Sequence, residues 1–216
     1  MEAVDESRAC VDDPAGAMTM AQQPAHDPSR YSYYVDDALY SELIADFETL
    51  RQDGPTVEDS AERDLFRGLV EREARLLDRL QFKQWLKFYA DECLYWVPST
   101  PNGGDPRREI AVMFDDRRRL EDRVFRLSTG FAWSQAPSSR TVRLVSNVEV
   151  LASENRDQRL VRSNFLISEF WDDETRTLAG WAGHRFRKIG GDWKISAKQV
   201  NLLVCDQSIR NPSIIL

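Results

Sequence analysis

Residues able to do chemistry are scarce in this sequence. The chain has two histidines, His26 and His184, and no cysteine lies within three residues of either one. A Rieske iron–sulfur cluster requires close Cys and His pairs, and a mononuclear iron triad requires two histidines with a carboxylate. Zinc sites of the Cys/His type lack ligands for the same reason. We therefore predict that this chain itself binds no metal.

His184 is the one candidate for general acid–base catalysis, and it falls in the middle of a predicted strand. A nearby carboxylate or phenol would let its ring shuttle a proton. The candidate partners are Asp91, Tyr95 and Asp206. An ordinary half-buried or interface histidine is the alternative, and we favour it because no partner is fixed by the sequence. Without a phosphate-binding loop or a nucleophile motif, we expect no catalytic and no cofactor-binding residues.

Two further groups of side chains favour structural roles over binding. The run Arg117–Arg119 alternates with acids along a predicted helix, so pairing three and four residues apart neutralises it. We expect a solvated or subunit-facing helix surface there rather than an anion site. The six tryptophans are expected in the core and at interfaces. Cys93 and Cys205 fall in apolar segments and are expected to act as small buried hydrophobic residues.

The composition is that of a soluble globular protein, and its charge is unevenly distributed. Residues 1–57 carry a net charge of −9 and the remainder +2, for a total of −7. A near-neutral body with an acidic arm gains little from counterion release, so nucleic-acid binding is disfavoured. No segment reaches the roughly 18 apolar residues of a membrane span, and the N-terminus lacks a signal-peptide core. With three scattered cysteines, this predicts a cytoplasmic protein with free thiols.

The elements that position these side chains divide the sequence into three parts. Residues 1–30 are rich in Asp, Pro, Ala and Gln and are predicted to form a disordered acidic arm. Residues 31–57 are predicted to be a helical extension, because apolar residues recur at helical spacing from Leu39 to Leu50. Residues 58–216 form the predicted main domain.

The main domain is predicted to begin with helices and to end with strands. Its first helix has a capping pattern at Thr56 and Asp59. The next elements are a short helix at 81–90, strands at 93–98 and 109–114, and a helix at 115–130 opened by Asp115 and Asp116 and closed by Gly130. Four long strands follow, at 141–152, 160–171, 178–189 and 192–204. Linkers this short cannot make parallel crossovers, so the pattern indicates an α+β fold with a long, strongly curved antiparallel sheet.

Residues 201–216, "NLLVCDQSIRNPSIIL", stay apolar to the last position. A chain end is ordinarily polar and frayed. This segment must therefore be covered by its own sheet or by another subunit, and the sequence leaves both open.

Three segments of the main domain resemble one known family. They are "EREARLLDRLQFKQWLKFYADECLYWVP", "FDDRRRLEDRVFRLSTGFAWSQAPSSRTVRLVSNVEV" and "GGDWKISAKQVNLLVCDQSI". In order and spacing over residues 58–216 they resemble the β (small) subunit of aromatic-ring-hydroxylating dioxygenases. The most specific motif residues are Arg126, Thr129, Gly130, Ala132, Trp133, Pro137, Ser139, Arg140, Ser146, Asn147 and Val148.

The resemblance implies a cystatin-like or NTF2-like cone in which N-terminal helices pack on the sheet. It also implies an α3β3 hexamer, in which this chain contacts the α subunit and other β subunits. The α subunit would carry the Rieske [2Fe-2S] cluster and the mononuclear Fe(II), and would receive NADH electrons through a reductase, often with a ferredoxin. It would add both atoms of O2 to an aromatic ring to give a cis-dihydrodiol. The β subunit would be structural, with an occasional influence on substrate range. Five residues are candidates for structural roles or subunit contacts: Arg126, Trp133, Arg140, Asn147 and Asp206.

Two other functions stay open at this point. One is a stand-alone NTF2-like dehydratase or isomerase that uses His184 as its acid or base. The other is a module that binds a small ligand in the cone. The segment 1–57 is longer than the family leads us to expect, which leaves open an extra subunit contact or a later start at Met18 or Met20.

Overall fold

The computed structural model describes residues 32–52, 54–101, 103–129, 138–209, 211 and 213–216. The helices in this part of the chain are α1 (Asp37–Arg51), α2 (Ser60–Asp78), α3 (Phe82–Leu86) and α4 (Arg117–Ser128). The strands are β1 (Tyr89–Pro98), β2 (Ala111–Asp116), β3 (Arg140–Leu151), β4 (Gln158–Trp171), β5 (Glu174–Ile189) and β6 (Asp192–Leu202). The predicted disordered arm, 1–30, and the predicted helix end at Gly130 lie outside the described residues.

The six strands form one sheet in the order β2-β1-β6-β5-β4-β3. The four long strands make the predicted meander, in which each strand pairs antiparallel with the next. The sheet is mostly antiparallel, as predicted, and its one parallel pair joins β1 to β6. The short linkers do not forbid this pair, since all the chain between β1 and β6 serves as the crossover.

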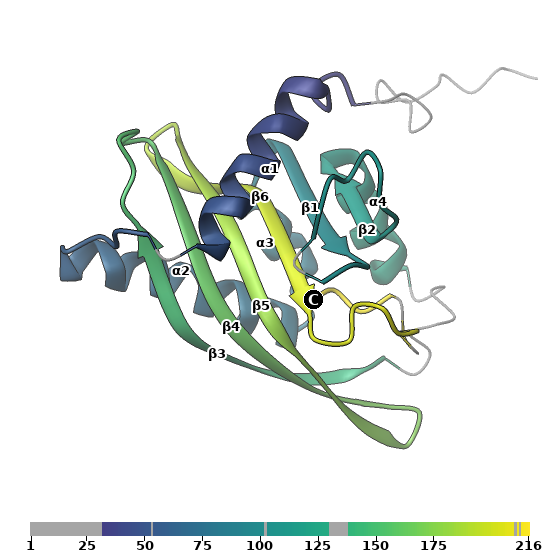
Figure 1. Ribbon diagram of the computed structural model, residues 1–216. Coiled ribbons are helices and arrows are strands. Elements are labelled where there is room, and N and C mark those ends of the chain that lie inside the picture. The colour runs from purple at the N-terminus through teal and green to yellow at the C-terminus, as the bar shows by residue number, and fades with distance from the viewer. Residues whose placement is uncertain (1–31, 53, 102, 130–137, 210, 212) are drawn as a thin grey trace, which may run out of the picture. The chain divides into compact units, whose positions relative to one another are not determined.

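Two tight turns set the register of the meander. Asp172 and Asp173, between β4 and β5, have φ angles of 52° and 59°. Gly190 and Gly191, between β5 and β6, have φ angles of 60° and 92°. Two central residues at positive φ define the hairpin turns whose twist matches that of the flanking strands. Strands of 14 and 16 residues can therefore stay paired along their length, and Figure 1 shows them bending together.

Helices cover both faces of the sheet. In β1, Leu94 and Trp96 face α1 and pack in a cluster with its Phe47. The intervening residue Tyr95 faces the opposite side, in the larger core that holds Phe66 of α2. This alternation follows from the two-residue period of a strand. Figure 1 shows α1 crossing the sheet on one side and α2 lying on the other.

Acidic side chains cap α1, α2 and α4, and the caps of α2 and α4 correct two predictions. Asp59 caps α2 by accepting a hydrogen bond from the amide of Ala61, whereas Thr56 forms an isolated bridge with Leu151. Asp116 caps α4, while Asp115 belongs to β2, where its carboxylate pairs with Arg123 at 2.6 Å. Both α2 and α4 still have an acidic side chain at the N-terminus, where the helix dipole favours negative charge.

The predicted short helix at 81–90 is shorter than expected, because Tyr89 already opens β1. Trp85 from this helix is fully buried, as predicted. The expectation of buried thiols is confirmed as well. Cys93 and Cys205 are both buried, and burial raises the pKa of the Cys93 thiol to about 12.

The last three residues of the apolar segment 201–216 are covered by their own chain, whereas Leu203 in the same segment is 77% exposed. Ile214, Ile215 and Leu216 are buried within the main core, against both α2 and the sheet. Of the two coverings that the sequence left open, covering by the same chain therefore applies to these three residues. Among the described helices, none is long and apolar enough to span a membrane.

Candidate functional site

An ionic cluster of Glu73, His184 and Lys198 lies buried between α2 and the sheet. Glu73 lies on the apolar stripe of α2, three residues after Val70 and four before Leu77, so the helix points it at the sheet. His184 on β5 and Lys198 on β6 are directly opposite each other in the strand register. Directly opposed residues have adjacent side chains on one face, so both reach the same carboxylate.

Glu73 accepts four hydrogen bonds. Its Oε1 accepts from Lys198 Nζ at 3.0 Å, from Trp85 Nε1 at 3.0 Å and from the Tyr89 hydroxyl at 2.9 Å. Its Oε2 lies 2.9 Å from His184 Nε2. A buried carboxylate is tolerable only when it is paired and hydrogen-bonded in this way.

The protonation states follow from this geometry. Burial by itself raises the pKa of Glu73, but the Lys198 ammonium and the His184 hydrogen bond outweigh it and hold the pKa well below its usual range. Burial lowers the pKa of His184, against the opposing effect of Glu73. Near pH 7, Glu73 and Lys198 therefore form the ion pair, and neutral His184 donates through Nε2. Its Nδ1 then carries a lone pair.

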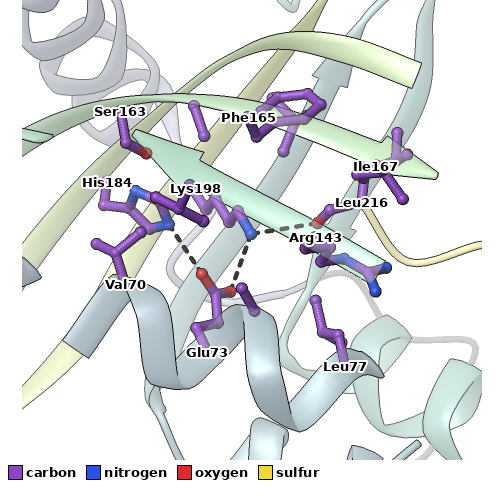
Figure 2. Close-up of a pocket in the computed structure, with 14 residues that line it drawn as sticks. Val70, Glu73, Leu77, Arg143, Ser163, Phe165, Ile167, His184, Lys198 and Leu216 are labelled. Carbon is purple, nitrogen blue, oxygen red and sulfur yellow. Dashed lines mark hydrogen bonds and ion pairs between the residues drawn. The ribbon is translucent and has the colours of Figure 1, made fainter. Parts of the chain in front are cut away.

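A small cavity lies beside the ionic cluster, with a volume of about 30 Å³. Its walls come from α2, from the inner face of β3–β6 and from Leu216. Figure 2 shows Glu73 rising from α2 toward His184 and Lys198, with Leu216 on the far side of Lys198. A volume of this size accommodates one water molecule. The arrangement can hold protons and bind a polar atom, but its walls leave no room for an organic substrate.

The structure gives His184 a different partner from those expected. Asp91 and Asp206 are exposed on the surface, and the carboxylate that reaches His184 is Glu73. Tyr95 belongs to the same surroundings, because the ammonium of Lys198 lies 5.7 Å from its ring centroid. The sequence analysis missed Glu73, although a charged residue on the apolar stripe of an amphipathic helix is the signal that could have found it.

The residues of the family motif do not gather at this cluster. Arg126, Arg140, Asn147 and Asp206 are all exposed, and Trp133 lies outside the described residues. The guanidinium of Arg140 stacks 4.6 Å above the ring of Phe170. Asn147 has a φ of 51° and lies where the register of β3 shifts against β4. Asparagine tolerates this left-handed conformation better than most residues, which explains why it fits at this irregularity of the strand.

Two arginines of the charged run on α4 lie close to acids, and one of these pairs has the predicted spacing of four residues. Arg117 pairs with Glu121 at 2.7 Å, and Arg118 lies 3.8 Å from Asp116. A second set of ion pairs, which the sequence did not reveal, joins α1 to the sheet. Its buried member is Arg185 of β5, and its acids on α1 are Glu42 and Asp46.

The described residues provide no set of ligands for iron. No group of three or more His, Cys, Asp or Glu side chains within this part of the chain could hold a metal ion. His184 is engaged with Glu73. The described residues therefore do not fit a Rieske cluster or a mononuclear iron site.

The outer face of the sheet, away from α2, carries an exposed apolar band made of Val142, Leu144 and Leu166. Leu144 and Leu166 are opposite each other in the register of β3 and β4. Their exposed fractions are 61% for Val142, 61% for Leu144 and 40% for Leu166. Contiguous apolar surface of this kind marks a site of interaction more often than an ordinary surface.

The fold of this chain is similar to that of a solved protein. A solved structure of naphthalene 1,2-dioxygenase with indole bound in its active site is similar with a TM-score of 0.62. The match covers 74% of this chain and 88% of that chain at 22% sequence identity, and it shows the fold alone. The predicted α+β class, with N-terminal helices on a curved and mostly antiparallel sheet, is confirmed.

Sequence similarity then gives the family. Residues 72–207 match the model of the ring hydroxylating beta subunit family. The small oxygenase component of the p-cumate 2,3-dioxygenase system of Pseudomonas putida is 34% identical over 133 residues, which are 61% of this chain and 73% of that protein. The benzoate 1,2-dioxygenase β subunit of Burkholderia mallei has a TM-score of 0.57 at 27% identity, over 72% of this chain and 98% of that one. The chain belongs to the family of ring-hydroxylating dioxygenase β subunits, and is thus a subunit of an oxidoreductase complex.

Proposed function

We propose that this chain is the non-catalytic, structural β subunit of a multicomponent aromatic-ring-hydroxylating dioxygenase. In this proposal a large α subunit carries the Rieske cluster and the mononuclear iron and receives NADH electrons through a reductase. The α subunit adds both atoms of O2 to an aromatic ring, and the product is a cis-dihydrodiol. The expected assembly is an α3β3 hexamer.

The apolar band on β3 and β4 is the observation that carries this proposal. Helix α1 covers one part of the outer face, where Leu160 of β4 packs in its cluster, but the band remains exposed. Covering Val142, Leu144 and Leu166 with another subunit would remove this apolar surface from water, at about 25 cal/mol per Å². A chain whose function is assembly is expected to present such a face.

The ionic cluster supports a structural role for the interior. Glu73 has its four donors within the chain, and its ionised state is held by Lys198. Each of these groups has a stabilising task in the fold without a substrate. The donor set for iron, absent from the described residues, would come from the large subunit.

Co-expression with a large subunit that carries both iron motifs tests the proposal. The two chains are expected to purify together as one brown complex, with the mass of three copies of each and with all of its iron in the large subunit. Size-exclusion chromatography with light scattering gives the mass, and iron analysis of the separated chains locates the metal. A stable monomer that turns over a substrate by itself, and loses this activity on His184→Ala, would contradict the proposal.

The substitution Leu144→Lys tests the apolar band directly. Burying an unpaired ammonium at an interface costs several kcal/mol, so the fraction of assembled hexamer is expected to fall at least tenfold. Ile110→Lys is the matched control, because Ile110 is 85% exposed just before β2, on the opposite edge strand of the sheet. Circular dichroism confirms that both variants fold. Equal assembly of both variants would show that the band is not an interface.

A further inference from the structure

The last described residues, 213–216, close one end of the cavity beside the ionic cluster, and we name them the tail. Ile214, Ile215 and Leu216 are each at most 4% exposed, and Leu216 forms part of the cavity wall. The tail lies outside the six strands. Its last two residues bond instead to side chains around the cavity, and Figure 2 shows the contact from Lys198 to Leu216.

Two cations and a phenol bind the main-chain oxygens of the tail. The oxygen of Leu216 accepts hydrogen bonds from the Tyr95 hydroxyl at 2.5 Å and from Lys198 Nζ at 3.2 Å. The oxygen of Ile215 accepts one from the guanidinium of Arg143. Charged donors of this kind bind a carboxylate oxygen at least as well as a carbonyl oxygen.

The rest of the cavity suits an aliphatic group. Apolar side chains from the helix and the sheet make most of its wall: Val70, Leu77, Val145, Phe165, Ile167 and Val200. Two polar atoms of the lining residues have no hydrogen-bond partner among the described residues: Nδ1 of the fully buried His184 and Nε of Arg143. With the tail in place the volume of about 30 Å³ admits only a water molecule.

We propose that the tail is an internal occupant of a ligand site, and that this site takes a short aliphatic acid or carbonyl compound when the tail moves out. The oxygen of the ligand replaces the main-chain oxygen of Leu216 at Lys198 and Tyr95. Its aliphatic body replaces the side chain of Leu216. A hydroxyl group on the ligand would donate to Nδ1 of His184. This binding function goes beyond the assembly role and does not rest on it.

Displacement of the tail sets the apparent affinity of the site. Because the last two residues of the tail bond to side chains rather than to a strand, their release leaves the sheet ladder intact and needs only a local opening. A ligand that binds only the open form has its affinity reduced by the fraction of molecules that are open. Removing the tail should therefore raise the measured affinity without any new contact.

Calorimetric titration with 4-methylpentanoate, whose carbon skeleton resembles the leucine side chain, tests the proposal. The intact chain is compared with a variant that stops after Ser213, each prepared with its large subunit if the two purify together. Binding to the shortened chain is expected to be at least tenfold tighter. The alcohol 4-methylpentan-1-ol has a similar shape without the carboxylate, and should bind at least tenfold more weakly than the acid.

Two lysines on β6 provide a matched pair of variants in the shortened chain. Lys198→Met should weaken binding of the acid at least tenfold. Lys194→Met should leave it unchanged, because Lys194 donates to the main chain of Lys87 outside the cavity. The chain has two histidines, so the ring signal of His184 can be assigned in a magnetic resonance spectrum with a His26→Asn variant. This signal should shift on binding.

The proposal is overturned if the shortened chain folds but does not bind the acid. It is also overturned if acid and alcohol bind equally tightly and Lys198→Met leaves the affinity unchanged. If the shortened chain does not fold, Leu216→Gly in the full chain is titrated in the same way. That variant keeps the main chain of the tail and opens the space of one side chain. Absence of binding to folded Leu216→Gly then rejects the proposal equally.

Discussion

Glu73 shows how a single carboxylate can be held inside a hydrophobic core. Taking a carboxylate out of water costs several kcal/mol, and one ion pair rarely offsets that cost. Here Lys198 supplies the opposite charge, while Trp85, Tyr89 and His184 satisfy the remaining lone pairs. The residue therefore joins α2 to α3, β1, β5 and β6 at one point. Its removal should affect the packing of all five elements.

Replacing Lys198 by Met is expected to lower the free energy of unfolding by about 3–5 kcal/mol, because it leaves the Glu73 charge buried without its cation. The double variant Glu73→Leu with Lys198→Met removes both charges and should recover part of this loss. Denaturant unfolding of the single and double variants measures the coupling. Lys194→Met, on the same strand but half exposed, should stay within about 0.5 kcal/mol of the parent. If Lys198→Met and Lys194→Met lose similar amounts of stability, the ionic cluster does not stabilise the fold.

The free energy of unfolding is expected to fall as the pH drops below 6.5. His184 titrates near 6.5 when unfolded, and burial lowers its pKa in the folded protein. Between these two values the unfolded chain binds more protons, so stability present above pH 6.5 is lost as the pH falls through the folded pKa. Glu73, whose pKa is lowered from 4.5, adds a loss of the same sign at more acidic pH.

Urea unfolding at pH 7.5, 6.5 and 5.5 measures this dependence. The parent should lose up to about 1.4 kcal/mol per pH unit more than His184→Gln, which cannot take up the proton. His26 is present in both proteins and cancels in the comparison. Parallel pH profiles for parent and variant would show that His184 does not contribute.

At the scale of elements, α1 is joined to the sheet by both apolar and ionic contacts. Phe47 packs against Trp96 with ring centroids 6.0 Å apart. Arg185, almost fully buried on β5, reaches Glu42 and Asp46 on the helix at 3.1 and 3.0 Å. This helix covers Trp96, which would otherwise meet water on that face. We infer that α1 is integral to the stability of the domain.

Phe47→Ala is expected to cost about 3–5 kcal/mol of folding free energy, since it opens a cavity between α1 and β1. Phe125→Ala removes the same atoms from a side chain on α4 that is 69% exposed. That control should change stability by no more than about 0.5 kcal/mol. Thermal or denaturant unfolding of the two variants gives the comparison. A small effect at Phe47 would mean that α1 is only loosely attached.

At the scale of the whole molecule, the described residues of the family motif and the buried ionic cluster lie on different parts of the domain. Arg140 lies on the edge strand β3 beside the apolar band, whereas the ionic cluster lies on the opposite face. The edge position and exposed face suit contact with another subunit. In the complex that we propose, the interior stabilises the domain, and the surface of β3 and β4 contacts another subunit.

Arg140→Ala is expected to weaken assembly with the large subunit at least tenfold, because arginines that stack on aromatic rings are common anchors of interfaces. Turnover per assembled iron should stay unchanged. Arg108→Ala is the control, since its side chain is 86% exposed. Chromatographic mass and turnover are measured on the same preparations. Intact hexamers with lost turnover would contradict the structural role.

The order of elements, the α+β class and the family could all be predicted from the sequence, because each depends on patterns within contiguous stretches. Strand alternation, helical spacing and two-residue turns are local, and the family motif spans a few dozen residues. The same reasoning identified His184 but not its partner. Glu73 lies 111 residues from His184 and 125 from Lys198, and no local rule relates such positions.

Only the tertiary structure decided which distant groups share the interior. The parallel pairing of β1 with β6 brings Tyr95 alongside Lys198, and the register of β5 with β6 sets Lys198 opposite His184. Leu216 completes the cavity wall from the far end of the sequence. A buried charge is stable only where several donors converge, and that convergence comes from packing, which a linear pattern of residue types does not contain.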